Sequence, residues 1–414
     1  MLAKFPAPFL LSFLIATSTA FGQDCSADAL INRQVRASET DAAIPFELFR
    51  HQVWINPACE AQELLLVHLP GTFDNPSRTT LFPALAANNG YHVVSLKYPN
   101  DLSAQSACRE SEDPDCYADF RREIVTGTDS TEALEVDRVN SIENRLQKLL
   151  QFLAEEFPAE AWDQFFDGEE IMWEKVVISG HSQGGGHAGF MAKDRTLARV
   201  IMFASPNDFD AVNNTAANWL ADPSLTPDSV YYAFGNRFDD IVEFGEEYLQ
   251  WNALGMGAFG DTINVLQAVP PYNESRMLYT TEQKPSLAVN HSLMITDEQV
   301  TLDENGAPIY EPVWKYLLGV AGIINEVEEL ADDLMFRLWP NPTRSSTWLE
   351  FNSEWQGETE IRVITLDGRM QSSVRVDARG PILLDLSTLS DGVYQIQAWS
   401  EGRILSVQQL VVAR

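Results

Sequence analysis

A serine between two glycines, where an apolar run meets a Gly-rich stretch, is the feature of the chain that most directly indicates chemistry. Residues 176–179 predict a buried strand, Gly180-His181-Ser182-Gln183-Gly184 follows directly, and residues 185–190 open a predicted helix. A serine on such a sharp strand-to-helix turn has its hydroxyl lifted clear of the sheet, and both flanking positions must be small. The helix N-terminus beside it favours developing negative charge. The pattern predicts Ser182 as a nucleophile for acyl transfer; the alternative is a Gly-rich turn without a catalytic role.

The Gly-x-Ser-x-Gly motif in this setting resembles the nucleophile turn of the α/β-hydrolase superfamily, in which the catalytic residues occur in the chain order Ser, acid, His. The resemblance implies a general base well after Ser182. Of the six histidines, five are unsuitable because they precede the serine, lie inside the motif or lie on the helix after it: His51, His68, His92, His181 and His187. His291 is therefore the predicted base, and the alternative is an ordinary exposed loop histidine.

The acid of such a triad is expected to follow a strand between Ser182 and His291. Residues 230–234 are typical of a β-strand, and Gly235-Asn-Arg-Phe-Asp-Asp-Ile-Val242 comes next. A Gly, a short spacer and Asp-x-Ile-Val resemble the acid loop of many α/β-hydrolases, and in that alignment Asp239 is the acid. Asp240 is the close alternative. Asp208 is the third candidate, because some relatives use the loop after the preceding strand.

An oxyanion hole for acyl transfer needs two backbone N–H donors. The resemblance assigns one to Gln183, the residue after the nucleophile, and the other to the loop after an early parallel strand. That loop, His68-Leu-Pro-Gly-Thr-Phe73, is similar to the Leu-Pro-Gly loops of the superfamily, which makes Thr72 the candidate. The implied reaction is ester cleavage through an acyl-enzyme intermediate, with His291 moving the proton. It needs no metal and no organic cofactor.

The substrate is less constrained by the sequence. The 51 residues between Asp239 and His291 are enough for an inserted cap. Large side chains occur there and in residues 159–173, namely Tyr248, Trp251, Met256, Phe259, Tyr272, Trp162, Phe165, Phe166 and Trp173. They predict either an apolar pocket for an acyl or aromatic group or ordinary core under long loops.

The predicted function is that of a secreted serine hydrolase, carboxylesterase or lipase-like, that cleaves small-molecule, lipid or polymer esters. Two alternatives use the same scaffold. One is a peptidase or acyltransferase, which thiol or amine acceptors would reveal. The other is a non-catalytic binding protein at the cell surface.

The elements that must hold these residues alternate between strands and helices. Apolar runs at 63–69, 91–96, 175–179, 199–204 and 230–234 predict strands, and residues 136–154 predict a helix that Pro158 stops. Such alternation predicts a mostly parallel sheet with helices on both faces. The resemblance therefore predicts an α/β-hydrolase domain over residues 23–324. The string Ser179-Gly-His-Ser-Gln-Gly-Gly-Gly-His187 also resembles a family of secreted bacterial hydrolases, and this closer match supplies no substrate.

Residues 1–22 have the charged, apolar and small-residue order of a secretory signal peptide, with a membrane anchor as the alternative. No later apolar run reaches the roughly 18 residues that a transmembrane helix needs. Four cysteines remain after the signal peptide, which indicates two disulfides. We expect Cys25–Cys59 and Cys108–Cys116, although the sequence allows three pairings.

The composition changes near residue 335. Residues 335–414 contain no Lys, eight Arg and nine acidic residues, so their net charge is −1, whereas residues 1–334 carry −31. Short alternating runs follow, separated by turn signals such as Asp367-Gly368 and Asp391-Gly392. This pattern predicts a small antiparallel β-sandwich over residues 338–414, after an acidic linker over 325–337.

Three motifs in this module carry a further resemblance: Trp339-Pro-Asn-Pro342, Leu366-Asp-Gly-Arg369 and Leu389-Ser-Asp-Gly-Val-Tyr394. In this order they resemble the C-terminal sorting domain of the type IX secretion system, found in the Bacteroidetes. The resemblance implies the secretion machinery as a partner, and export followed by release or attachment to the outer-membrane surface. The alternative is a carbohydrate-binding or spacer sandwich.

Composition narrows the remaining partners. The chain of 414 residues carries a net charge of −32, which disfavours nucleic acids, anionic membranes and strongly anionic substrates. Its 45% apolar content provides ample material for a folded core.

Overall fold

The computed structural model divides the chain into two compact units, residues 1–321 and 322–414. It describes residues 25–168, 170–285 and 289–320 of the first unit. In the second unit it describes residues 336–339, 341, 343–351, 358–365, 370–377, 381–390, 392–400 and 403–412. The predicted signal peptide lies outside these residues, as does the predicted linker apart from its last two residues. The predicted division into signal peptide, hydrolase domain, linker and sorting domain therefore stays a prediction.

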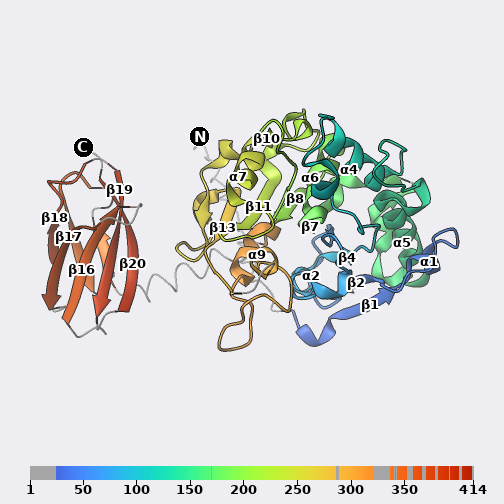
Figure 1. Cartoon of the computed structure of the whole chain (residues 1–414). Helices are drawn as coiled ribbons and strands as arrows, with labels where there is room; N and C mark the ends of the chain where they lie inside the picture. Colours follow the sequence, from blue (N-terminus) through green and yellow to red (C-terminus); the bar gives the residue numbers. More distant parts are fainter. Residues whose placement is uncertain are drawn as a thin grey trace, which may run out of the picture. The chain divides into compact units, whose positions relative to one another are not determined.

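The first unit is built on one nine-stranded mixed sheet (Figure 1). Its strands, in spatial order, are β1 (Ile31–Val35), β2 (His51–Ile55), β4 (His92–Ser95), β3 (Leu65–Leu69), β7 (Val176–His181), β8 (Arg199–Phe203), β11 (Tyr231–Asn236), β13 (Met277–Thr280) and β12 (Ile263–Asn264). From β4 to β12 all neighbouring strands are parallel. β2 is antiparallel to both of its neighbours. Two short antiparallel ribbons, β5 (Phe166–Asp167) with β6 (Glu170–Ile171) and β9 (Phe209–Asp210) with β10 (Thr215–Ala216), lie outside the sheet.

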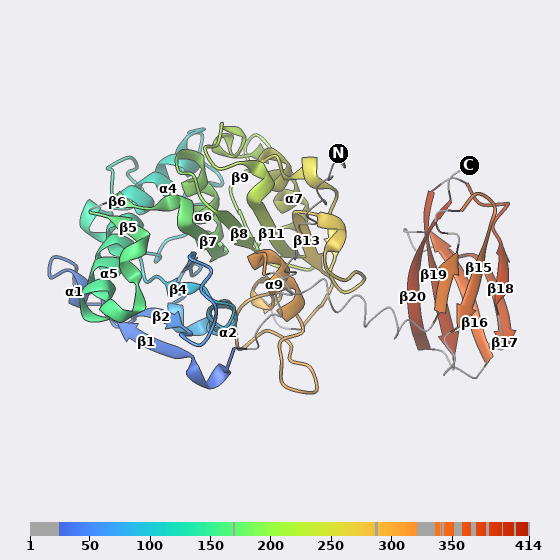
Figure 2. The same ribbon diagram turned by 180° about the vertical axis from the view of Figure 1, so that it is seen from behind.

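Helices cover both faces of this sheet (Figure 1), as the view from behind also shows (Figure 2). The helices of the first unit are α1 (Ala37–Thr40), α2 (Leu81–Ala87), α3 (Ala104–Cys108), α4 (Cys116–Thr126), α5 (Ile142–Glu156), α6 (Gln183–Asp194), α7 (Phe244–Ala253), α8 (Val289–Ser292) and α9 (Glu311–Leu318). Alternate residues of each central strand enter two separate cores. Leu65 and Val67 of β3 belong to a core that includes α4, α5, α6 and α7, whereas Leu66 belongs to a core that includes α2 and α9. Burial on both faces explains the continuous apolar runs of the parallel strands.

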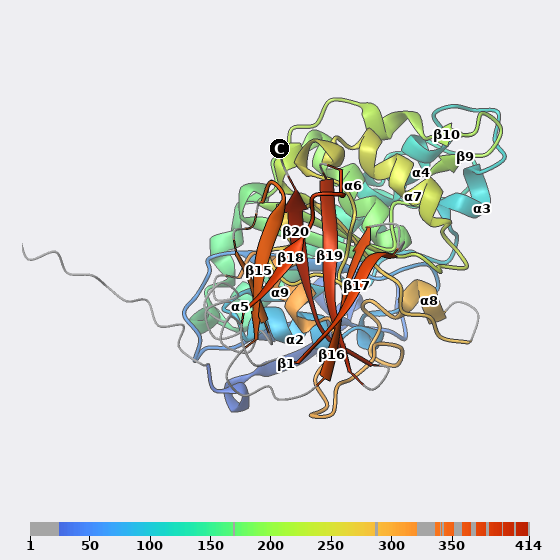
Figure 3. The ribbon, with the colours of Figure 1, turned by 90° about the vertical axis from the view of Figure 1, so that its left-hand side faces the viewer.

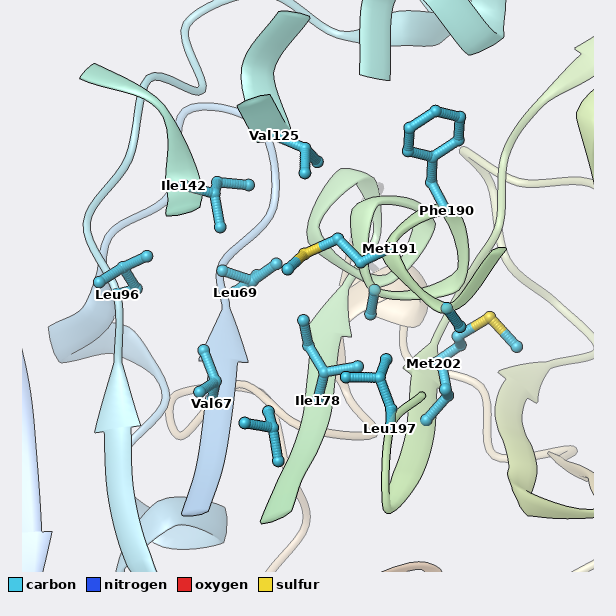
Figure 4. Packing of buried hydrophobic residues seen from close by; sticks show 14 of the residues in the cluster. Val67, Leu69, Leu96, Val125, Ile142, Ile178, Phe190, Met191, Leu197 and Met202 are labelled. Carbon is cyan, nitrogen blue, oxygen red and sulfur yellow. The ribbon is translucent and has the colours of Figure 1, made fainter. Parts of the chain in front are cut away.

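The core under α6 holds the end of β7 in place. Figure 4 shows Ile178 of β7 between Val67 of β3 and Met202 of β8, with Met191 of α6 reaching toward Leu69. All four apolar neighbours are fully buried. The junction between β7 and α6 is therefore fixed by packing from three strands and one helix.

Helix α5 begins six residues later than the sequence predicts. Ser141 has an extended backbone, and its hydroxyl accepts the N–H of Asn144, so it acts as the N-cap. Residues 138–140 before it form a separate 3-10 turn. The predicted apolar stripe is otherwise confirmed from Ile142 to Leu153, whose side chains are fully buried.

Both expected disulfides are present in the first unit. Cys25 is bonded to Cys59, and Cys108 to Cys116, with Cα–Cα distances of 5.0 and 5.6 Å. The first connects the start of the described chain to the loop after β2, and the second links α3 to α4.

The second unit consists of two small antiparallel sheets (Figure 3). One contains β14 (Phe336–Trp339), β15 (Ser346–Phe351) and β18 (Ile382–Asp385), and the other contains β17 (Met370–Asp377), β16 (Glu358–Thr365), β19 (Gly392–Ser400) and β20 (Arg403–Val412). Residues of both sheets form one core, including Phe336, Leu349, Ile361 and Ile396. No helix occurs among the described residues of this unit. The short alternating runs that the sequence predicts as strands are found as β15 to β20, and β14 is an additional strand that starts within the predicted linker.

No helix in the described part of the chain is long and apolar enough to cross a membrane.

Candidate active site

Ser182 occupies a strained turn between β7 and α6. Its φ of 54° and ψ of −121° lie outside the usual regions for a non-glycine residue. A Cβ added to Gly184 would lie 2.0 Å from the carbonyl oxygen of Leu69, and one added to Gly180 would lie 2.2 Å from the carbonyl carbon of Gly184. These close approaches explain why both flanking residues are glycine. The turn has the geometry that the sequence motif predicts for an exposed nucleophile.

His291, on the short helix α8, contacts the acid loop after β11. Its Nδ1 lies 2.7 Å from Oδ2 of Asp239, whose side chain is fully buried, while the side chain of His291 is 8% exposed. The other oxygen of Asp239 accepts the N–H groups of Ile241 and Val242, at 2.7 and 2.9 Å. Because a carboxylate only accepts, the proton of the neutral imidazole is on Nδ1 in this contact, which leaves the lone pair on Nε2. The imidazole thus has the tautomer that a general base needs.

The two other candidate carboxylates lie elsewhere. Asp240 is exposed. Asp208 is fully buried and forms a bidentate ion pair with Arg121, and it also accepts the indole N–H of Trp219 at 2.8 Å. Asp239 is therefore the candidate that the fold brings to His291.

Two buried side chains, His181 and Arg121, form hydrogen bonds with residues around Ser182. The sequence motifs predict no role for either of them. His181 Nε2 donates to the carbonyl oxygen of His291 at 3.0 Å, and the two rings lie 4.8 Å apart. Burial keeps the pKa of His181 well below its usual value, and the nearby His291 adds to this effect. Arg121 donates to the carbonyl oxygen of Gln183 at 3.2 Å. A neutral His181 thus supports the base, and Arg121 fixes the first turn of α6.

The two predicted oxyanion donors belong to neighbouring segments. Gln183 is the first residue of α6, so its N–H has no carbonyl one turn earlier to donate to. The N–H of Thr72 has no hydrogen-bond partner among the described residues. The side chains of the two residues connect the segments, because the Thr72 hydroxyl donates to Oε1 of Gln183 at 3.1 Å. The same oxygen accepts the N–H of Ala104 at 3.0 Å.

These residues line one cavity of about 450 Å³, which includes Ser182, His291, Thr72 and Gln183. None of the hydrogen bonds between described residues joins Ser182 to His291. In many resting hydrolases this hydrogen bond is long and tightens only when substrate binds. The cavity therefore brings together a serine, an imidazole and the two residues predicted to supply the oxyanion N–H groups, and Asp239 lies behind the imidazole.

The large side chains that the sequence offers for an acyl pocket do not line this cavity. Trp162, Phe165, Trp251 and Met256 are fully buried in the core of the first unit, and none of them lines the cavity. The segment between Asp239 and His291 contributes α7, β12 and β13 to the body of the unit. For these four residues the interpretation as ordinary core is correct, and that of an acyl pocket is wrong.

One further titratable group lies close to the acid loop. Glu247 on α7 is fully buried, and no side chain among the described residues forms a hydrogen bond with its carboxyl oxygens. Burial raises the pKa of Glu247 well above its usual value, and the negative charge of Asp239 raises it further. The protonated form of Glu247 is thus favoured in this buried position beside the acid loop. In the described part of the chain, no cluster of His, Cys, Asp and Glu could hold a metal ion.

Comparison with known proteins identifies the second unit. Residues 337–413 match the family model described as "Secretion system C-terminal sorting domain". The match supports the assignment of this module to type IX secretion sorting, and with it export to the extracellular space or the outer-membrane surface.

The other comparisons carry less information. A search of curated proteins found no match. Similar solved structures include a Klebsiella pneumoniae protein assigned as a dienelactone hydrolase, with 9% identity over 70% of this chain and 98% of that chain, and a TM-score of 0.35. Another is the BSP domain of a biofilm associated protein, with 12% identity over 19% of this chain and 14% of that chain, and a TM-score of 0.17. Both scores are too low to bear on function.

Proposed function

We propose that the protein is a secreted serine hydrolase of the α/β-hydrolase fold that cleaves carboxylic esters. Ser182 is the nucleophile, His291 the general base and Asp239 the acid that orients it. The observation that carries the proposal is the contact between His291 Nδ1 and the buried carboxylate of Asp239, beside the cavity that Ser182 lines. The chain order Ser, Asp, His and the strand-to-helix turn support the same fold assignment.

The first half of the reaction forms the acyl-enzyme. Nε2 of His291 takes the proton of the Ser182 hydroxyl while Oγ attacks the ester carbonyl carbon. The N–H groups of Gln183 and Thr72 stabilise the oxyanion, and the positive end of α6 adds to this. The carbon–oxygen bond to the alcohol then breaks, and His291 returns the proton to the leaving oxygen.

The second half releases the acid. Water loses a proton to His291 and attacks the acyl-enzyme, and the oxyanion forms again in the same place. The bond to Ser182 Oγ then breaks, and His291 returns the proton to Oγ, which regenerates the free enzyme. Asp239 stabilises the imidazolium at both stages, because its carboxylate faces the protonated Nδ1. The overall reaction consumes one ester and one water and yields one carboxylic acid and one alcohol.

The test is the hydrolysis of p-nitrophenyl acetate by the full chain and by Ser182→Ala. Removing the nucleophile should lower kcat by about 10⁴-fold or more, while the far-UV spectrum and the unfolding midpoint stay unchanged. Ser229→Ala is the matched control, since Ser229 does not line the cavity. Residual activity of Ser182→Ala within tenfold of wild type would falsify the nucleophile assignment.

A further inference from the structure

Most residues that line the catalytic cavity have polar side chains. Among the described lining residues, apart from Gly71, only Phe73, Ala104 and Ile241 have apolar side chains. The others carry hydroxyl, amide, imidazole, carboxylate or guanidinium groups. A long acyl chain gains its affinity from burial of apolar surface, and this wall offers little of it. The part of the substrate that fills the cavity is therefore expected to carry hydrogen-bonding groups and no long acyl chain.

Asp74 and Arg78 contribute opposite charges to this wall and are only loosely paired. Asp74 Oδ1 lies 3.6 Å from Nη1 of Arg78, and Arg78 Nη2 lies 3.5 Å from the exposed Glu298. Asp74 Oδ1 also accepts the N–H of Asn75 at 2.8 Å, whereas no hydrogen bond between described residues uses Oδ2. The pair thus presents an acceptor and several donors to a ligand. Hydroxyl groups satisfy both kinds of partner, because each hydroxyl donates one hydrogen bond and accepts others.

Phe73 adds an exposed aromatic ring to the same wall. Its side chain is 76% exposed, although its φ of 59° is unusual for a bulky residue. The loop that carries it is clamped by the buried Asn100, which accepts the N–H of Phe73 through its carbonyl oxygen at 2.9 Å. The Asn100 side chain donates to the carbonyl oxygens of Gly71 and Asp74. A rigid loop therefore holds a flat apolar surface beside hydrogen-bonding groups.

A sugar residue has the complementary surface, with one apolar face of C–H groups and an edge of hydroxyl groups. The charge of the chain selects among sugars, since residues 1–334 carry −31 and repel anionic ones. Resting on the proposed hydrolase function, the geometry points to esters of short acyl groups on neutral sugars as the substrates of this site. Phe73 contacts the sugar ring, and Asp74 and Arg78 bind its hydroxyl groups.

The experiment compares four esters on the full chain. Methyl 6-O-acetyl-glucoside is the expected substrate. Cyclohexylmethyl acetate keeps the acyl group and a six-membered ring but has no hydroxyls, methyl 6-O-palmitoyl-glucoside lengthens the acyl chain, and p-nitrophenyl acetate reports the basic activity. We expect kcat/KM on the acetylated glucoside to exceed that on the cyclohexyl and palmitoyl esters by at least about tenfold each, the range that unpaired polar groups in a site provide.

Two variants locate this preference. Phe73→Ala and Asp74→Asn should each raise KM for the acetylated glucoside by about fivefold or more and remove most of the preference over cyclohexylmethyl acetate. Phe46→Ala is the matched control, because Phe46 is 71% exposed and does not line the cavity. It should leave all four rates unchanged.

The outcomes separate this inference from the proposed function. Hydrolysis of p-nitrophenyl acetate with equal or higher rates on the cyclohexyl or palmitoyl ester would overturn the sugar inference and leave the hydrolase proposal standing. Equal KM values for Phe73→Ala, Asp74→Asn and wild type would also overturn it. Hydrolysis of none of the four esters by a folded sample would contradict the proposed function itself, and the inference with it.

Discussion

The three candidate acids differ in burial and in hydrogen-bond partners, and their expected roles differ accordingly. Asp239 is buried, accepts two backbone N–H groups and contacts His291. Asp208 instead neutralises the buried Arg121, and Asp240 is exposed. Sequence patterns could not separate neighbouring Asp239 and Asp240, because the choice depends on which side chain the turn after β11 directs inward.

We predict that Asp239→Asn lowers kcat by about 10⁴-fold, because the amide favours the wrong tautomer of His291. Asp240→Asn should change kcat by less than about threefold, as expected for an exposed side chain. Asp208→Asn should mainly destabilise the fold, by about 3–5 kcal/mol, because it leaves Arg121 buried without its partner. Ester hydrolysis and urea unfolding of the three variants measure these effects. Equal losses of kcat for Asp239→Asn and Asp240→Asn would contradict the assignment.

The raised pKa of Glu247 predicts a pH dependence of stability. Its pKa in the folded state is raised above the ordinary value of 4.5, so the folded state retains a proton that the unfolded state loses. Stability is therefore lost as pH rises from 4.5 toward the folded-state pKa, by about 1.4 kcal/mol per pH unit. Glu247→Gln removes this term. The stability of the variant relative to wild type should rise between pH 5 and pH 7 in urea unfolding, and parallel curves would show that Glu247 is ionised in the folded protein.

At the scale of elements, the junction of β7 and α6 depends on the glycines that flank Ser182. Gly184→Ala would place a Cβ 2.0 Å from the Leu69 carbonyl oxygen, which belongs to a neighbouring strand and cannot move aside. We predict a loss of stability of about 2–4 kcal/mol and a large loss of kcat, because the turn that holds Ser182 must shift. Gly245→Ala is the matched control: its Cβ would lie 3.7 Å from a Glu243 carboxylate oxygen, on an exposed part of α7. It should be neutral or stabilise by up to about 1 kcal/mol. Thermal unfolding of both variants tests this, and equal effects would show that the turn tolerates a side chain.

The central strands and the apolar stripe of α5 could be predicted, because burial on two faces or on one stripe leaves a periodic signal. The start of α5 could not, since apolar Val136 and Val139 extend the pattern beyond the cap at Ser141. The other residues that line the cavity with Ser182 could not be predicted either. Arg121, Asp74 and Asn207 come from loops and helices far apart in the chain, and only the order of strands in the sheet brings them to one cavity. The interpretation of the large apolar residues as an acyl pocket was wrong because composition does not distinguish core from pocket.

At the scale of the whole molecule, the two units differ in net charge and in the role that each is assigned. The first unit, residues 1–321, carries a net charge of −26 and holds the candidate site, whereas the second, residues 322–414, carries −6 and matches a sorting domain for secretion over residues 337–413. The disulfides of the first unit are consistent with an oxidising destination outside the cytosol. In the proposed mechanism, the residues of the chain alone supply the nucleophile, base and oxyanion donors.

The most direct test of the central claim is to treat the full chain with a fluorophosphonate probe and to locate the adduct by peptide mass mapping. An activated serine reacts with such a probe because the base and the oxyanion donors act on phosphorus as they do on an ester. We predict stoichiometric labelling at Ser182, none for Ser182→Ala, and strongly slowed labelling for Asp239→Asn. A folded sample that remains unlabelled, or that is labelled at another serine, would contradict the assignment of Ser182, His291 and Asp239 as a catalytic triad.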